Sequence, residues 1–207
     1  MELMDILGKL FSSMALVKIM RLFLLNPDQA FENSDISERS KVPASALRTE
    51  MAILTGVSFV KKKTFYKEIP AKASHKKPTK KRVNGWCLNP DFPYLYPLRI
   101  LLLNSELVNK KQAISKIKSA GKIKLVVLSG IFLGEDSRRI DILVVGDQIN
   151  KKRLENALKT IESEVGKELQ YAAMDTDEFH YRLGMYDKFV RDILDYPHEK
   201  LIDKIGL

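Results

Sequence analysis

One basic segment carries the whole charge excess of this chain. Residues 61–82, KKKTFYKEIPAKASHKKPTKKR, hold ten Lys and Arg residues and one acid, Glu68, which is a net charge of +9. The formal net charge of all 207 residues is also +9, so the rest of the chain is neutral. A neutral chain with one cationic segment is suited to meet a polyanion at a defined place, because Lys and Arg placed against phosphates release condensed counterions.

The sequence around this segment has to identify its partner. Nucleic acid and an anionic membrane surface both present dense negative charge, and a third interpretation is a solvated loop with no partner. No apolar stretch approaches the roughly 20 residues that span a bilayer, so we expect no membrane insertion. Hydrophobic residues make up 45% of the chain, which is ample for a buried core outside the basic segment.

The cysteine and histidine content argues against a metal site. The chain has a single cysteine, Cys87, which forms no internal disulfide and fits a reducing environment. His75, His180 and His198 are scattered, with no ligand at metal-binding spacing. We therefore expect a cytoplasmic protein with no zinc and no cofactor.

The N-terminal residues have a helical apolar pattern. The apolar positions alternate by four and three, which predicts one stripe along one helix: Leu3, Leu7, Leu10, Met14 and Val17. Two uses of the stripe stay open, packing in the core and a dimer seam.

Two shorter helices follow. The break at residues 26–28 and the polar residues at 33–35 predict a short helix over 35–42, and Pro43 opens a third helix that Gly56 closes. In the third helix, Leu47, Met51 and Leu54 repeat on one side. Small or polar residues and one arginine remain on the other side, as entry into a DNA groove requires: Ala44, Ser45, Arg48 and Thr49.

From Val57 onward the pattern changes to that of β-strands. Residues 57–69 and 82–89 enclose the polar loop 70–81, which predicts a hairpin with a basic loop. Trp86 and Leu88 alternate as in a half-buried strand, which favours core packing of Trp86 over stacking on single-stranded bases.

The series of three helices and a hairpin, with VPASALRTEM followed by LTGVSFVKKK, resembles the winged helix-turn-helix of transcriptional regulators over residues 1–92. The resemblance implies that residues 43–56 are the recognition helix and that the basic segment is a wing that binds phosphate or the minor groove. The partner is then double-stranded DNA, and one winged helix per chain implies a homodimer on paired half-sites. The predicted DNA contacts are Ala44, Ser45, Arg48, Thr49, Lys61, Lys62, Lys63, Lys76, Lys77, Lys80, Lys81 and Arg82.

A second domain begins after a proline-rich link. Residues 93–108 are expected to hold the link and a helix from about Pro97 to Leu103. After a helix at 110–120, strands at 124–130 and 140–146, a helix at 151–165, a strand at 169–174 and helical segments to the end are predicted. LVVLSGIFLGEDSRRIDILVVGD resembles the nucleotidyltransferase superfamily, which has a polymerase-beta-like fold. The expected fold class is therefore α+β, a winged helix followed by a small mixed-sheet nucleotidyltransferase-like α/β domain over 109–207.

The resemblance also implies a metal site that this chain has largely lost. The family holds Mg²⁺ with an Asp-x-Asp pair on one strand and a third carboxylate on a later strand, and it has a Gly-Ser turn for the triphosphate. Here Asp141 stands in the place of the second aspartate and Arg139 in the place of the first. Ile131 replaces the serine, and Gln170 or Tyr171 stands where the third carboxylate belongs. We expect no catalytic residue, no bound metal and no transferase activity.

Asp141 then has three interpretations. It forms an ion pair with Arg138 or Arg139, it keeps residual metal binding, or it belongs to a metal-free pocket for a nucleotide or another anionic effector. The members of that pocket are Ser129, Gly130, Arg138, Arg139 and Asp141.

The sequence thus predicts a DNA-binding transcription regulator whose degenerate nucleotidyltransferase-like domain serves dimerisation, partner binding or ligand sensing. The alternatives are an active nucleotidyltransferase that modifies RNA, protein or a small molecule, and an interaction protein that engages RNA or anionic lipid.

Overall fold

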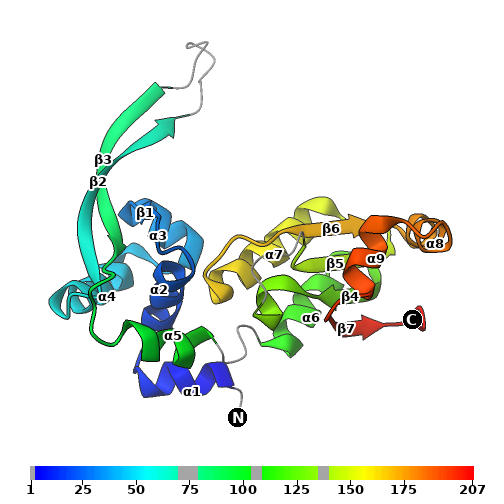
Figure 1. Cartoon of the computed structure of the whole chain (residues 1–207), viewed down its shortest axis with the longest axis horizontal. Coiled ribbons are helices and arrows are strands. Elements are labelled where there is room, and N and C mark those ends of the chain that lie inside the picture. Colours follow the sequence, from blue (N-terminus) through cyan, green and yellow to red (C-terminus); the bar gives the residue numbers. More distant parts are fainter. Residues whose placement is uncertain (1–2, 70–78, 104–108, 135–139) are drawn as a thin grey trace. The chain divides into compact units, whose positions relative to one another are not determined.

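The computed structural model describes residues 3–69, 79–103, 109–134 and 140–207 (Figure 1). The fold is mixed α+β, with two small sheets. The chain divides into two compact units. The first includes Asp5–Leu103, and the second includes most of the chain after residue 103. The helix before residue 104 therefore falls in the first unit.

The first unit begins with two helices where the sequence predicted one. Helix α1 spans Leu3–Leu10 and α2 spans Met14–Leu25. Ser12 between them has φ +56, and the Ser13 side chain caps α2 by accepting a hydrogen bond from Leu16 N. The predicted continuous stripe is therefore wrong. Val17 is fully buried in the core, whereas Leu10 is 65% exposed.

Helices α3 (Asn33–Ser40) and α4 (Ala44–Gly56) confirm the two helices predicted around Pro43. Lys41 adopts the left-handed conformation that ends α3, and Pro43 directly precedes α4, as its fixed φ suits. Ile36 of α3 and Leu54 of α4 pack in one buried cluster with Phe23 of α2. This cluster is the core that holds α4 in place.

A three-stranded antiparallel sheet completes the unit. The strands β2 (Val60–Ile69) and β3 (Thr79–Leu88) form the predicted hairpin, and β1 (Ala30–Phe31) pairs with the other side of β3. The strand order is β1-β3-β2. Figure 1 shows the hairpin rising from the helices beside α3 and β1. Helix α5 (Leu95–Leu103) follows, with Leu102 fully buried.

The second unit is built on a four-stranded mixed sheet of order β6-β5-β4-β7. Its strands are β4 (Lys122–Leu128), β5 (Ile142–Asp147), β6 (Tyr171–Met174) and β7 (Glu199–Asp203). Strand β5 is antiparallel to β4 and parallel to β6. The 3-10 helix Gly130–Leu133 lies between β4 and β5.

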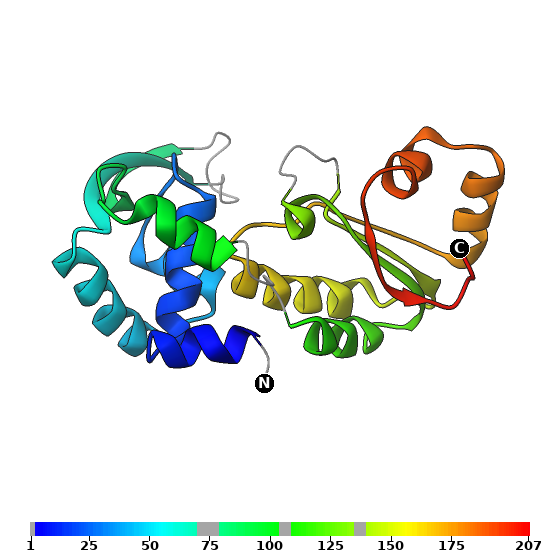
Figure 2. The ribbon, with the colours of Figure 1, turned by 60° about the horizontal axis from the view of Figure 1, so that its bottom comes forward.

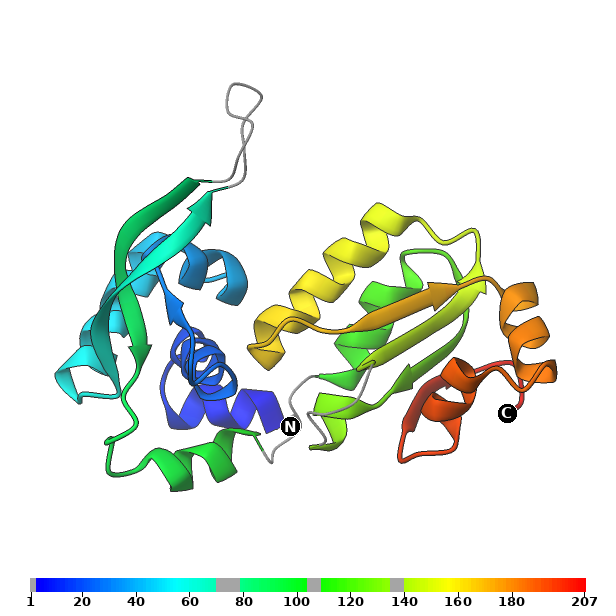
Figure 3. The same ribbon diagram turned by 45° about the horizontal axis from the view of Figure 1, so that its top comes forward.

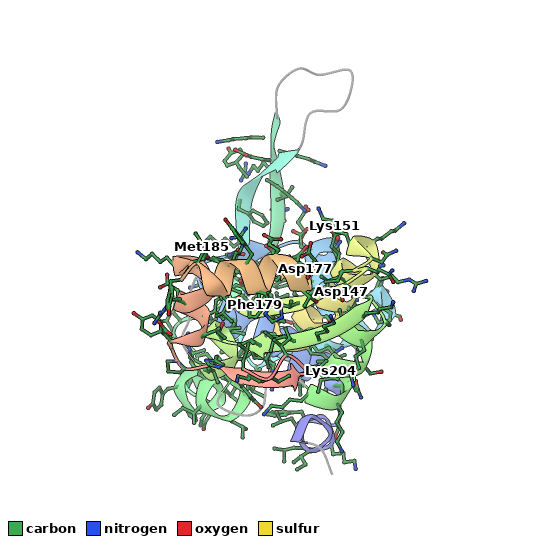
Figure 4. All side chains as sticks on the ribbon, turned by 90° about the vertical axis from the view of Figure 1, so that its right-hand side faces the viewer. Asp147, Lys151, Asp177, Phe179, Met185 and Lys204 are labelled. Atoms are coloured by element: carbon green, nitrogen blue, oxygen red, sulfur yellow. The ribbon has the colours of Figure 1, made fainter. Side chains whose placement is uncertain are left out.

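Helices cover both faces of this sheet (Figures 2 and 3). On one face lie α6 (Lys110–Lys118) and α7 (Lys151–Val165), and on the other lie α8 (Thr176–Gly184) and α9 (Lys188–Leu194). Phe179 of α8 is fully buried in a cluster with residues of β4 and β5, while Met185 at the end of the helix is 65% exposed (Figure 4). The prediction of helical structure to the end of the chain was wrong, because β7 pairs with β4 as an edge strand.

Candidate nucleic-acid interface

Helix α4 presents the predicted groove-entry residues on one exposed side. Leu47, Met51 and Leu54 are buried, so the helix has a fixed rotation about its axis. The four residues expected to contact DNA from this helix are all exposed: Ala44, Ser45, Arg48 and Thr49. Arg48 is the only charged side chain among them, and its neighbours are small enough for another molecule to approach the helix closely.

The register of the hairpin sorts its side chains into two faces, because directly paired residues point to the same side of a sheet. The first face carries the pairs Lys62 with Trp86, Thr64 with Asn84, and Tyr66 with Arg82. The second face carries the pairs Lys61 with Cys87, Lys63 with Gly85, and Lys67 with Lys81.

Six of the predicted hairpin cations lie in described strands, and all six are exposed: Lys61, Lys62, Lys63, Lys80, Lys81 and Arg82. Lys80 lies 3.7 Å from Glu68 in an ion pair whose side chains are both 69% exposed, so water screens it strongly. The predicted contacts Lys76 and Lys77 lie outside the described residues.

Two shallow depressions connect α4 with the hairpin. The first, of about 600 Å³, lies between α3, α4 and β3, and its lining includes Arg48, Ser37 and Trp86. The second, of about 650 Å³, continues along the hairpin to Lys62 and Asn84. Asn33, Ser34 and Trp86 line both. We call this continuous surface the α4–hairpin groove.

Trp86 lies where the two depressions meet. It is half-buried and packs against the core cluster, as the sequence predicted. Its indole Nε1 donates a hydrogen bond to Asn33 Oδ1 at 2.9 Å, and the Lys62 ammonium lies 5.9 Å from its ring centroid. Trp86 therefore joins the hairpin to α3 while its remaining surface lines the groove.

Lys67 has a role that the sequence analysis did not identify. Its Nζ donates to Asp35 Oδ1 at 2.5 Å and to Glu32 Oε2 at 3.1 Å, both at the start of α3. These hydrogen bonds, the one to Asp35 first, raise the pKa of Lys67 above its ordinary value. Lysine and acids lie more than 30 positions apart in the chain, so only the folded hairpin brings them together.

In the second unit, Asp141 bonds to backbone groups on two sides. Its Oδ1 accepts from Ile131 N at 3.0 Å, and its Oδ2 accepts from Gln170 N at 2.8 Å. Gly130 has φ +57, and a Cβ at this position would collide with Asp141 Oδ1. The carboxylate therefore fastens the turn after β4 to the segment that leads into β6.

Ser129, the other described polar side chain of the predicted anion pocket, has local partners as well. The Ser129 hydroxyl donates to Ile140 O at 2.6 Å, and Ser129 N donates to Asp141 O at 2.9 Å. Arg138 and Arg139 lie outside the described residues, so the predicted ion pair with Asp141 and the complete anion pocket stay predictions.

The positions expected to complete a metal site lie beside Asp141. Gln170 O accepts a hydrogen bond from Asp141 N at 2.7 Å, Gln170 N donates to the Asp141 carboxylate, and Tyr171 pairs with Ile142. Over the described ranges, no group of three or more His, Cys, Asp or Glu side chains is placed to hold a metal ion.

Comparisons of the chain with protein-family models, with curated proteins and with solved structures found no match. Within the part of the chain that the structure describes, no helix combines the length and apolar character needed to cross a bilayer.

Proposed function

We propose that the first unit is a winged helix-turn-helix that binds double-stranded DNA, and that the protein is a transcription regulator. The observation that carries the proposal is the continuity of the α4–hairpin groove. It joins a helix with small exposed residues and one arginine to a hairpin whose described strands carry six exposed cations. The order α2, β1, α3, α4, β2 and β3, with sheet order β1-β3-β2, supports the winged-helix assignment.

In this proposal α4 enters the major groove. Arg48 supplies the base contact, since its guanidinium matches the two acceptors of guanine. Ala44, Ser45 and Thr49 let the helix approach the base edges without a steric clash. The buried row of Leu47, Met51 and Leu54 fixes the side of the helix that faces the DNA.

The hairpin supplies the phosphate contacts. Lys62 and Arg82 lie on the face that continues from Trp86 and the groove, so a DNA backbone passing over Trp86 meets them next. If about six cations of the basic segment meet phosphates, affinity falls on the order of a thousandfold between 50 and 200 mM salt.

We further propose that the second unit is a nucleotidyltransferase-like domain without transferase activity. The antiparallel strands β4 and β5, joined through a glycine turn, with α7 leading to a parallel β6, support the assignment. The absence of activity is supported by Asp141, whose two carboxylate oxygens accept backbone N–H groups. Its role is then dimerisation, partner binding or sensing of an anionic effector.

Selection of bound duplexes from a random pool at physiological salt tests the DNA-binding proposal. We expect enrichment of duplexes with two related half-sites, because a homodimer places two α4 helices on the DNA. Single-stranded RNA and anionic lipid vesicles serve as competitors in the same measurement. The proposal fails if either competitor displaces the duplex at equal charge concentration, or if no sequence is enriched.

The active-enzyme alternative has its own assay. A nucleotide-incorporation assay with Mg²⁺ and labelled nucleoside triphosphates is expected to show no transfer. Mg²⁺-dependent transfer that Asp141→Asn abolishes would establish the alternative function and refute the proposed loss of activity.

A further inference from the structure

We infer that Lys67 is a positioning residue that holds the hairpin against α3, so that the groove-facing cations keep a fixed place relative to α4. The inference rests on the proposed DNA binding for its functional consequence. The position of the hairpin itself depends only on the contact between Lys67, Glu32 and Asp35, with or without DNA. We call these three residues the hairpin latch.

The latch lies in the part of the hairpin that no longer pairs with β1. Strand β1 pairs with β3 only at Trp86 and Cys87. The pair of Lys67 with Lys81 lies five residues farther along β3, roughly 17 Å at about 3.4 Å per residue. Beyond β1 the sheet is a two-stranded ribbon, which by itself is only marginally stable in water. A contact from α3 at this distance therefore limits how far the ribbon swings.

The charges at this position need a counterion. Lys67 and Lys81 stand directly opposite each other, and like charges in such a pair destabilise a hairpin. Glu32 and Asp35 supply negative charge from the start of α3. In the described contacts both acids bond to Lys67 and neither bonds to Lys81. The two acids thus neutralise the repulsion between Lys67 and Lys81 and attach the hairpin to α3.

The acids are themselves fixed in place. Glu32 and Asp35 form the capping box of α3, in which Asp35 Oδ2 accepts from Glu32 N at 3.2 Å. Asp35 Oδ1 is left to accept from Lys67. Because each carboxylate already has one backbone partner, the tether attaches the hairpin to a rigid helix end.

The lining of the α4–hairpin groove includes Glu32 but not Lys67. Register places Lys67 with Lys81 on the face opposite Lys62, Tyr66 and Arg82. Its side chain is 39% exposed, and its ammonium is committed to two carboxylates. Lys67 therefore acts on DNA binding through the position of the hairpin, whereas Lys81, its cross-strand neighbour, is available to phosphate.

The test compares three variants of the full chain: Lys67→Met, the double variant Glu32→Gln with Asp35→Asn, and Lys81→Met as the matched control. Gln and Asn keep one acceptor oxygen for the α3 cap and remove only the charge, so α3 stays formed, which circular dichroism verifies. Hydrogen exchange of the β2 and β3 amides is measured without DNA. Binding of a fluorescent duplex of mixed sequence is measured across a salt series.

The two latch variants are expected to exchange faster near residues 63–67 and 81–85 and to bind duplex about fivefold more weakly. Lys81→Met removes the like charge opposite Lys67, so it is expected to slow exchange or leave it unchanged, never to speed it, and to reduce the salt slope by about 0.9. The acid variant is decisive, because removing two negative charges beside a DNA site strengthens binding if the acids act only by repulsion.

Tighter binding by the acid variant, or exchange rates equal to those of the unmodified chain, would overturn the inference. A different result would refute the proposed DNA binding. If no variant and not even the unmodified chain binds duplex, the DNA-binding proposal is refuted, while the exchange rates still decide whether the latch holds the hairpin.

Discussion

At the residue scale, Gly130 and Asp141 depend on each other. Gly130 has the left-handed φ of +57 that an L side chain adopts only at a cost, and a Cβ there would displace the Asp141 carboxylate from Ile131 N. We predict that Gly130→Ala lowers the free energy of unfolding by about 2–4 kcal/mol, from backbone strain and lost hydrogen bonds. Denaturant unfolding measures the change.

Gly134 provides the control for that substitution. It also has a left-handed φ, of +77, but a Cβ there meets no atom within 4 Å. Gly134→Ala is therefore expected to cost only the strain, about 1 kcal/mol. Equal losses in the two variants would show that Asp141 does not depend on the glycine beside it.

Ser13 has two structural tasks at once. Its hydroxyl oxygen caps α2, and the hydroxyl donates to Glu50 Oε1 at 2.5 Å on α4, where Glu50 is only 8% exposed. We predict that Ser13→Ala lowers the free energy of unfolding by about 2–3 kcal/mol, because the cap is lost and a buried carboxylate loses its donor. Ser45→Ala, at an exposed position of α4, is expected to change it by less than about 0.5 kcal/mol. A similar loss in both variants would contradict the buried contact.

At the scale of elements, Asp147, labelled in Figure 4, connects the end of β5 with Lys124 of β4 and with Thr176 N of α8. The neighbouring Thr176 hydroxyl and then the Lys124 ammonium lower the pKa of Asp147 to about 2. An aspartate in an unfolded chain titrates near pH 3.9, so this contribution to stability is present above about pH 4 and is lost as the pH falls toward 2.

We therefore predict that Asp147→Asn makes the free energy of unfolding less dependent on pH between about 4 and 2 than it is in the unmodified chain. Urea unfolding at a series of pH values measures this dependence. Asp177→Asn, which removes an exposed acid in the first turn of α8, is the control and should keep the original pH dependence. A steep acid response in Asp147→Asn would assign the effect to other carboxylates.

Elements with a long periodic pattern were predictable from the sequence, and short ones were not. Helix α7 has the predicted bounds, and α4 and the hairpin lie where the apolar spacing placed them. Strand β1 has two residues, too few for an alternation to be visible, and β7 is defined by its pairing with β4, a segment more than 70 residues earlier in the chain. The α1–α2 break is a left-handed turn at Ser12 inside an otherwise helical apolar pattern.

In the candidate site, too, some features were predictable from the sequence and others were not. Exposure of Arg48 and of the hairpin lysines followed from periodicity and charge, since both are properties of neighbouring residues. The bonds of Lys67 to α3 and of Asp141 to backbone N–H groups did not, because they join segments that are distant in the chain. Such partners become known only when the register of the strands is known.

At the scale of the whole molecule, the proposed DNA binding assigns affinity mainly to the cationic hairpin and specificity to Arg48. Phosphate contacts contribute to binding of every sequence, whereas a base contact contributes to one. We predict that replacing Lys62 and Arg82 by Gln weakens binding to all duplexes alike and reduces the salt slope by about 1.8, which is about 0.9 for each lost phosphate contact. Arg48→Ala should instead cost about 1–3 kcal/mol on the selected duplex and little on others.

Salt titrations on a selected and a mixed-sequence duplex measure both effects in the same series. Lys188→Gln, at an exposed position that begins α9 in the other unit, is the control; it removes one positive charge, as Arg48→Ala does, and should leave binding to both duplexes unaffected. The contrast depends on geometry, because all these substitutions remove positive charge while only the hairpin pair and Arg48 line the proposed path of the DNA. If Lys188→Gln weakens binding as much per charge removed as the hairpin substitutions do, net charge drives the association and the groove is not its site.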